Sequence, residues 1–235
     1  MKLLNDKFSP QLIIILTILF GYSIIAHFYP YLDIWLSQQF FHEDLQNFYL
    51  KDNIILIILR LINYFSPILI VGYCVIVIFL HYNTKIPINT IKSYLINYKL
   101  AYFILSFYLI ITISLIKVLK LYFARSRPRD ITLFGGDYPF QAAWEKANYA
   151  IIESHSFPSA ESAIAMSMIL IPWCMPKSQL RTILLFVFSL WIAFVSFNRV
   201  LFGAHFLSDI VTSWAIILFF IVVWSKIFNK ILALR

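Results

Sequence analysis

The stretch SFNRVLFGAHFLSD, residues 196–209, contains a histidine and a carboxylate at a spacing that permits joint chemistry. His205 and Asp209 are four residues apart, so in a helix they lie on one face, one turn from each other. A carboxylate there can fix the tautomer and orientation of an imidazole that acts as a nucleophile or general base. Such a pair can also simply satisfy itself at a membrane interface. Arg199, across the short turn 202–204, favours a site for an anion.

A second polar group is basic and lies in KVLKLYFARSRPRD, residues 117–130. Positive charge next to an apolar segment is costly at membrane depth unless it is paired or functional. We expect Lys120 and Arg127 to contact a substrate. For Arg125 and Arg129 we expect side chains that extend to lipid phosphates at the interface.

The third group is SFPSAES, residues 156–162, which opens another apolar segment. A helix start with Pro158 just ahead of Ser159 offers backbone N–H groups, including that of Ala160, to an anion. Together with the cations at positions 120, 127 and 199, this helix start predicts a phosphate site. Glu161 stands where such a site would be expected to have a neutral or positive proton donor.

The elements that must position these residues are membrane helices. Of the 235 residues, 61% are hydrophobic and 13% are charged, which is far from the composition of a soluble domain. Several segments reach the roughly 20 residues that span a bilayer. We therefore predict an all-α integral membrane protein, with residues 1–235 as a single membrane domain. The predicted spans are 11–30, 53–81, 99–123, 159–175, 182–201 and 205–227.

Basic residues predict the orientation of these spans. If the N-terminus is cytoplasmic, the outer segment between the first two spans carries only Lys51. The cytoplasmic segments then carry Lys2, Lys7, Lys85, Lys92, Lys99, Lys177, Arg181, Lys226, Lys230 and Arg235. The three polar groups described above all fall on the outer face, so we expect them to converge there.

Several further expectations concern the rest of the chain. Segment 31–52 mixes aromatic and acidic residues and is expected to be an amphipathic interfacial helix on the outer face. Segment 125–158 is expected to be an irregular outer-face loop. Arg60, inside the second span, has only a possible partner on another helix. The net charge of +8 does not indicate nucleic acid, because the basic residues are scattered among membrane segments. The two cysteines, Cys74 and Cys174, are expected to be packing residues.

The polar groups, taken in order, resemble the type 2 phosphatidic acid phosphatase (PAP2) family. Its signature is Lys-x6-Arg-Pro, then Pro-Ser-Gly-His, then Ser-Arg-x5-His-x3-Asp. The resemblance covers residues 99–224, has its motif core at 117–210, and implies six transmembrane helices in a PAP2-type helical bundle. The matching residues are Lys120, Arg127, Pro128, Pro158, Ser159, Arg199, His205 and Asp209.

The resemblance implies phosphoester hydrolysis without a metal or another cofactor. His205 is then the nucleophile that forms a phosphohistidine, and Asp209 orients it. Lys120, Arg127 and Arg199 are the residues implied to hold the phosphate oxygens and offset charge in the transition state. Ser159 and the N–H of Ala160 are implied to add hydrogen bonds.

Three positions depart from the family pattern: Asn198 replaces Ser, Ala160 replaces Gly, and Glu161 replaces the His that protonates the leaving oxygen in the family. Three interpretations of Glu161 stay open. It is favoured only by the helix dipole, in a protein that binds without turnover; it is itself the acid; or the leaving group is good enough to need little protonation. His155 is a less favoured substitute acid.

The pattern RPRDITLFGG followed by SFPSAES is similar to the lipid A phosphatase branch of the family. We therefore expect a lipid phosphatase of a bacterial inner membrane, with cytoplasmic termini and a periplasmic active site. Its expected partners are the bilayer and a lipid A-type or polyprenyl phosphate substrate, without nucleic acid or an obligate protein partner. A lipid phosphotransferase of the same family and a non-catalytic lipid-phosphate binding protein are the alternatives; nothing in the sequence supports transport.

Overall fold

A computed structural model describes residues 9–48, 50, 52–83, 97–148 and 155–233. Six of the basic residues that predict the topology lie outside these ranges: Lys2, Lys7, Lys51, Lys85, Lys92 and Arg235. The helices and strands are α1 (Pro10–Phe28), α2 (Tyr31–Gln38), β1 (Phe41–His42), β2 (Asn47–Phe48), α3 (Ile54–Asn83), α4 (Tyr98–Phe107), α5 (Ile116–Phe123), α6 (Ala160–Ser167), α7 (Leu170–Trp173), α8 (Gln179–Leu201) and α9 (Leu207–Ala233). A π-helical segment, Tyr108–Leu115, joins α4 to α5.

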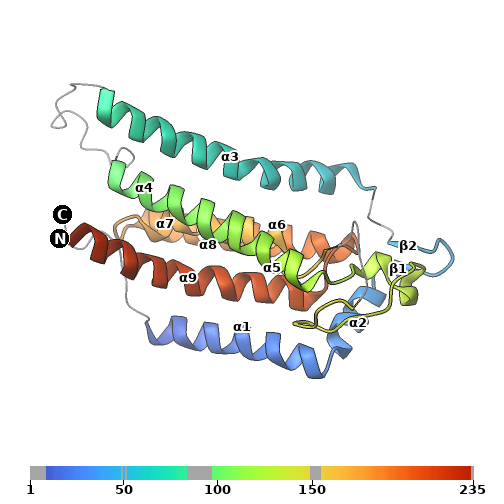
Figure 1. Ribbon diagram of the computed structural model, residues 1–235. Coiled ribbons are helices and arrows are strands. Elements are labelled where there is room, and N and C mark those ends of the chain that lie inside the picture. The colour runs from blue at the N-terminus through green and yellow to red at the C-terminus, as the bar shows by residue number, and fades with distance from the viewer. Residues whose placement is uncertain (1–8, 49, 51, 84–96, 149–154, 234–235) are drawn as a thin grey trace.

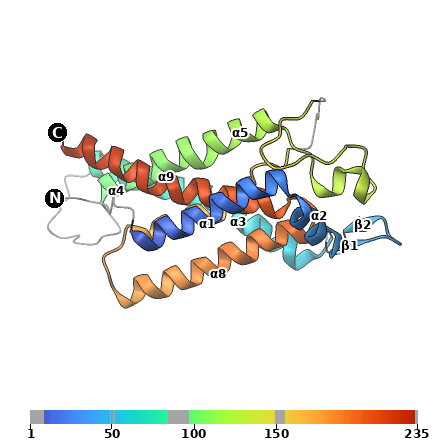
Figure 2. The same cartoon turned by 90° about the horizontal axis from the view of Figure 1, so that it is seen from below.

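The long helices lie side by side in one bundle (Figure 1). The start of α1 and the end of α9 are at one end of the bundle. At the other end lie α2, the small β1–β2 hairpin and the irregular segment after α5. In the second view, α5 and α8 lie on opposite sides with α9 between them (Figure 2). The predicted site residues lie at the end of α5, the start of α6, the end of α8 and the start of α9. These four helix termini lie at the same end of the bundle (Figure 1).

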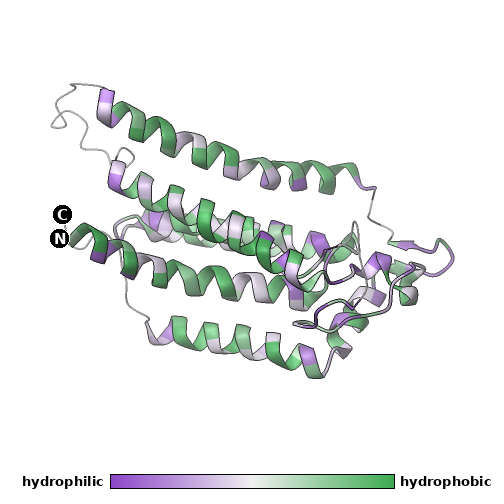
Figure 3. Ribbon diagram, in the orientation of Figure 1, coloured by the Kyte–Doolittle hydropathy of each residue, from purple (hydrophilic) through white to green (hydrophobic). Residues whose placement is uncertain are grey.

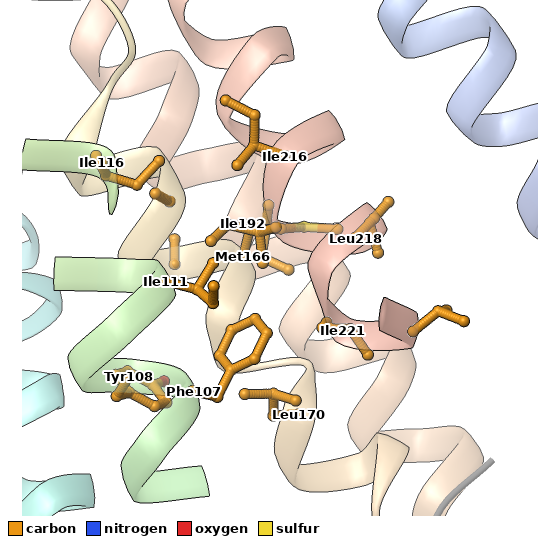
Figure 4. Close-up of a cluster of buried hydrophobic side chains, with 14 of the residues drawn as sticks. Phe107, Tyr108, Ile111, Ile116, Met166, Leu170, Ile192, Ile216, Leu218 and Ile221 are labelled. Atoms are coloured by element: carbon orange, nitrogen blue, oxygen red, sulfur yellow. The ribbon is translucent and has the colours of Figure 1, made fainter. Parts of the chain in front are cut away.

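Helix α9 is the centre of the bundle. In its most apolar stretch 61% of the residues are buried, against 17% in α3 and in α8. It packs against α1, α4 and α6, and its inward face meets aromatic and aliphatic side chains from the neighbouring helices (Figure 4). The core cluster drawn there includes Phe107, Tyr108, Ile111, Met166, Leu170, Ile192, Ile216 and Ile221.

Most residues of the outer helices are apolar (Figure 3), and many of their large apolar side chains are uncovered. Ile18, Leu69 and Phe186 are each more than 60% exposed. Such surfaces suit a hydrocarbon environment, where helices satisfy their own backbone polar groups. The expectation of an all-α integral membrane protein is confirmed.

Five helical segments among the described residues are long and apolar enough to cross a membrane. They correspond to every predicted span except 159–175. That segment forms α6 and α7, a 14-residue apolar piece, which covers about 20 Å at 1.5 Å per residue and is shorter than a bilayer core of ~30 Å. The count of six spans stays a prediction.

Segment 31–52 does not form one helix, so that expectation is wrong. Only Tyr31–Gln38 is helical, and Phe41–His42 pairs with Asn47–Phe48 in an antiparallel hairpin. Asp33 and Ser37 of α2 are each 1% exposed, so this helix is docked into the protein. The described part of 125–158 is irregular, with 3-10 turns at Pro128–Asp130 and Thr132–Phe134.

The turn between α8 and α9 depends on a glycine. Gly203 has a φ of +58°, and a Cβ added there would lie 2.3 Å from the ring of Phe48, a side chain that is 2% exposed. A residue other than glycine would therefore meet both backbone strain and a rigid, buried ring.

We predict that Gly203→Ala destabilises the protein by ~1–3 kcal/mol. Gly72→Ala in α3 is the control, because a Cβ there meets nothing within 4 Å. Thermal unfolding of both variants in detergent checks this, and a Gly203→Ala protein that melts like the wild type would contradict the predicted clash.

Candidate active site

The predicted site residues meet at one end of the bundle, and backbone hydrogen bonds hold their segments together. Ser159 N–H, at the start of α6, donates to the carbonyl of Asp209 in α9 at 3.2 Å. Arg129 N–H, after α5, donates to the carbonyl of Gly203 between α8 and α9 at 3.0 Å. These bonds fix the three motif segments relative to one another.

His205 and Asp209 form the pair that their spacing predicts. His205 Nδ1 lies 3.4 Å from Asp209 Oδ2, and both residues are buried. The backbone N–H of Phe206 donates to the same carboxylate oxygen at 2.9 Å. With Nδ1 directed toward Asp209, the second ring nitrogen, Nε2, is left to face a reactant.

Three cations act on this imidazole. Burial, followed by the positive charges of Lys120, Arg199 and Arg127, holds the pKa of His205 well below its ordinary value of 6.5. The low pKa keeps the imidazole neutral near pH 7, which is the form that a nucleophile requires. The structure thus brings Lys120, Arg127 and Arg199 together around His205.

The start of α6 is formed as predicted. Ser159 is the N-cap, and its Oγ accepts a hydrogen bond from Ser162 N–H at 3.3 Å. Ala160 is the first helical residue, so its backbone N–H belongs to the first turn, whose N–H groups have no partner within the helix. The Ser213 hydroxyl of α9 donates to the Ser159 carbonyl at 2.9 Å and holds this turn in place.

Glu161 lies in the same first turn, between two arginines. Arg60 Nε donates to its Oε1 at 3.0 Å, and Arg199 Nη1 lies 3.3 Å from its Oε2. The Glu161 side chain is 11% exposed and that of Arg60 is 44% exposed. Arg60 therefore has the partner on another helix that the sequence left open.

Arg125 does not extend to lipid phosphates, so that expectation is wrong. Its side chain is fully buried, and Nη1 donates to Asp209 Oδ1 at 2.6 Å while Nη2 donates to Asp33 Oδ2 at 3.0 Å. A buried guanidinium needs such partners because its desolvation is costly. Arg125 supports the His205–Asp209 pair from behind.

The sequence family model of the PAP2 superfamily matches residues 101–232 of this chain, a region that contains all three motif segments. This chain belongs to the PAP2 superfamily. The match confirms the resemblance at the level of the superfamily.

A solved PAP2 structure has a similar fold. It is the crystal structure of a transmembrane PAP2-type phosphatidylglycerolphosphate phosphatase from Bacillus subtilis, 19% identical, with a TM-score of 0.58 over 92% of this chain and 96% of that one. At this identity the similarity shows the fold alone. No curated protein matches the sequence.

Two residues at the site lie outside the region matched by the PAP2 model: Arg60 in α3 and Asp33 in α2. Sequence reasoning gave neither of them a role. Each had a signal in the sequence that could have indicated a polar partner: Arg60 is a charge inside an apolar span, and Asp33 is a single acid in the apolar stretch YLDIWL. Among the described residues, no three His, Cys, Asp or Glu side chains gather as metal ligands would.

We predict that His205 stays neutral well below pH 6.5, because burial and the three cations disfavour the imidazolium. NMR of ring-labelled histidines in detergent checks this, with the His205 signal assigned by its loss in His205→Ala. A titration midpoint at pH 6.5 or above would contradict the electrostatics described here.

Proposed function

We propose that this protein is a membrane lipid phosphatase that removes phosphate from a lipid A-type or polyprenyl (di)phosphate lipid through a phosphohistidine on His205. The observation that carries the proposal is a buried imidazole that is paired with Asp209 through Nδ1 and lies within the positive charge of Lys120, Arg127 and Arg199. Membership of the PAP2 superfamily supports a lipid phosphatase at the level of the family. The choice of lipid is part of the proposal.

The reaction proceeds in two displacements. Nε2 of neutral His205 attacks phosphorus, and the N–P bond forms as the P–O bond to the lipid breaks. The lipid oxygen leaves with the bonding electrons, and a leaving oxygen that is basic enough takes up a proton from water. Water then attacks phosphorus, the N–P bond breaks, and inorganic phosphate and neutral imidazole are released.

The cations stabilise charge during these steps. Lys120, Arg127 and Arg199 bind the phosphate oxygens and offset the negative charge of the transition state. Ser159 and the Ala160 N–H, at the start of α6, add hydrogen bonds to the same anion. No metal or cofactor is part of this route.

Glu161 sets the choice of substrate. Arg60 lies 3.0 Å from one of its carboxylate oxygens, and Arg199 lies 3.3 Å from the other. A carboxyl group that is engaged by a guanidinium at each oxygen is poorly placed to donate a proton to a substrate, so the site suits a leaving group that needs little protonation. A sugar anomeric oxygen, as in a lipid A 1-phosphate, meets that requirement better than a lipid alkoxide. So does the polyprenyl phosphate that leaves when a polyprenyl diphosphate loses its terminal phosphoryl group.

The proposal also includes the location of the site. The site residues gather at the end of the bundle opposite the start of α1 and the end of α9 (Figure 1). With cytoplasmic termini, as the basic residues predict, that end faces the periplasm of a bacterial inner membrane.

The proposed function makes a prediction about turnover. Purified protein in mixed micelles is expected to release more phosphate from lipid A 1-phosphate or a polyprenyl diphosphate than from phosphatidic acid. His205→Ala is expected to lower the rate of phosphate release at least a thousandfold, on the order seen when a nucleophile is removed. His81→Ala, at the other end of α3, is the control. Phosphate found only on an acceptor lipid would identify a phosphotransferase, and binding without reaction would identify a non-catalytic binder.

A further prediction separates the two roles open to Glu161, which are a counter-ion for arginine and the general acid. Glu161→Gln and Arg60→Gln both break the Glu161–Arg60 ion pair, and Glu161→Gln also breaks the pair with Arg199. If Glu161 is a counter-ion, both variants change KM and keep kcat within about tenfold. If it is the acid, Glu161→Gln alone lowers kcat by 10²–10⁴-fold, the usual range for a lost acid. We expect the first result, and kcat measured for both variants on one diphosphate substrate decides between them.

A further inference from the structure

Helix α2 supplies a carboxylate to the support of the nucleophile. Asp33 Oδ1 accepts a hydrogen bond from Ser208 N–H, in the first turn of α9, at 2.8 Å. Its Oδ2 accepts from the Ser208 hydroxyl and from Arg125 Nη2. Asp33 thus caps the helix that carries Asp209, although it is 176 positions away in the chain.

Arg125 connects this carboxylate to the His205–Asp209 pair. Its remaining donors bind the Ser208 hydroxyl at 2.8 Å and the Gln141 carbonyl at 2.9 Å, and the ring of Phe206 lies 4.3 Å from its guanidinium carbon. Each of the four hydrogen bonds that the Arg125 guanidinium donates ends on an acceptor of a buried residue. The guanidinium therefore cannot shift without moving Asp209.

The charges of this cluster also matter for His205. Arg125 alone would neutralise Asp209 and leave it a weak partner for a positively charged imidazole. Burial raises the pKa of Asp33, while the Arg125 charge and the Ser208 hydrogen bonds oppose that rise. Because Asp33 accepts hydrogen bonds from three donors, its contacts are those of an ionised carboxylate. Asp33, Arg125 and Asp209 together then carry a net charge of −1 behind the imidazole.

We propose that Asp33 and Arg125 are positioning residues for His205, acting through Asp209. Asp33 holds the guanidinium in place and offsets its charge, so that Asp209 can orient His205 and stabilise the positive charge that develops on the ring. The inference rests on the proposed function, and it extends the active site to a helix outside the region matched by the PAP2 model.

Asp33→Asn tests this with the full-length protein. The amide keeps the size of the side chain and removes its charge. We expect kcat to fall about 10- to 100-fold, as for outer partners of catalytic groups, with KM changed less than twofold because Asp33 does not contact the phosphate site. We also expect the His205 titration midpoint to move to lower pH, a change that a merely structural role would not produce. Asp33→Glu should recover part of kcat.

Ser37→Ala is the matched control. Ser37 lies in the same helix, is equally buried and bonds only the backbone carbonyl of Asp33, so kcat and the His205 midpoint should stay as in the wild type. If Asp33→Asn does not fold, Ser208→Ala decides, since it keeps both charges and removes the hydroxyl that joins Asp33 to Arg125. We expect it to lower kcat severalfold at unchanged KM.

Three results would overturn the inference: an unchanged kcat in folded Asp33→Asn, an unchanged kcat in Ser208→Ala, or a loss confined to KM. Failure of the proposed function gives a different result. In that case the wild type itself shows no turnover that depends on His205, whereas the shift of the His205 midpoint in Asp33→Asn is still measurable by NMR.

Discussion

Burying an arginine at the end of a membrane bundle is costly unless its donors find acceptors, and Arg125 makes four hydrogen bonds, two of them to carboxylates. One carboxylate comes from α2 and the other from α9, while the arginine itself follows α5. Losing one partner of such a pair costs about 3–5 kcal/mol. The pairing therefore fixes three distant segments at the place where the motif residues meet.

Two sets of charges act on His205. The first is the buried cluster of Asp209, Arg125 and Asp33, which reaches the ring through Nδ1. The second is made of Lys120, Arg127 and Arg199, which favour an anion and disfavour protonation of the free imidazole. An incoming phosphate would be attracted by the cations and would meet a neutral, oriented ring. Glu161 engages Arg60 and Arg199. In the proposed mechanism, its role determines which leaving groups the site can use.

The sequence predicted those features that depend on composition and local spacing. Long apolar segments predicted five of the membrane-length helical segments, and the His-x-x-x-Asp spacing predicted the His205–Asp209 pair at the start of α9. Features that depend on distant partners were not predictable. Arg125 was expected at the lipid surface because its two acceptors lie 92 and 84 residues away. Asp33 lies in a segment that the sequence predicts to be an interfacial helix. Its burial was not predictable, because it depends on contacts with α9 and with the segment after α5. The break between α6 and α7 likewise has no clear signal in an apolar sequence.

In the proposed mechanism His205, oriented by Asp209 and surrounded by positive charge, accepts the phosphoryl group. The most direct measurement is rapid mixing with a lipid substrate labelled on the phosphate, followed by an alkaline quench that preserves phosphohistidine and by peptide mapping. We expect transient label on the peptide that contains His205, formed and lost at rates that match turnover. Turnover with the label on another residue, or on no residue at any time from milliseconds to the steady state, would contradict this mechanism.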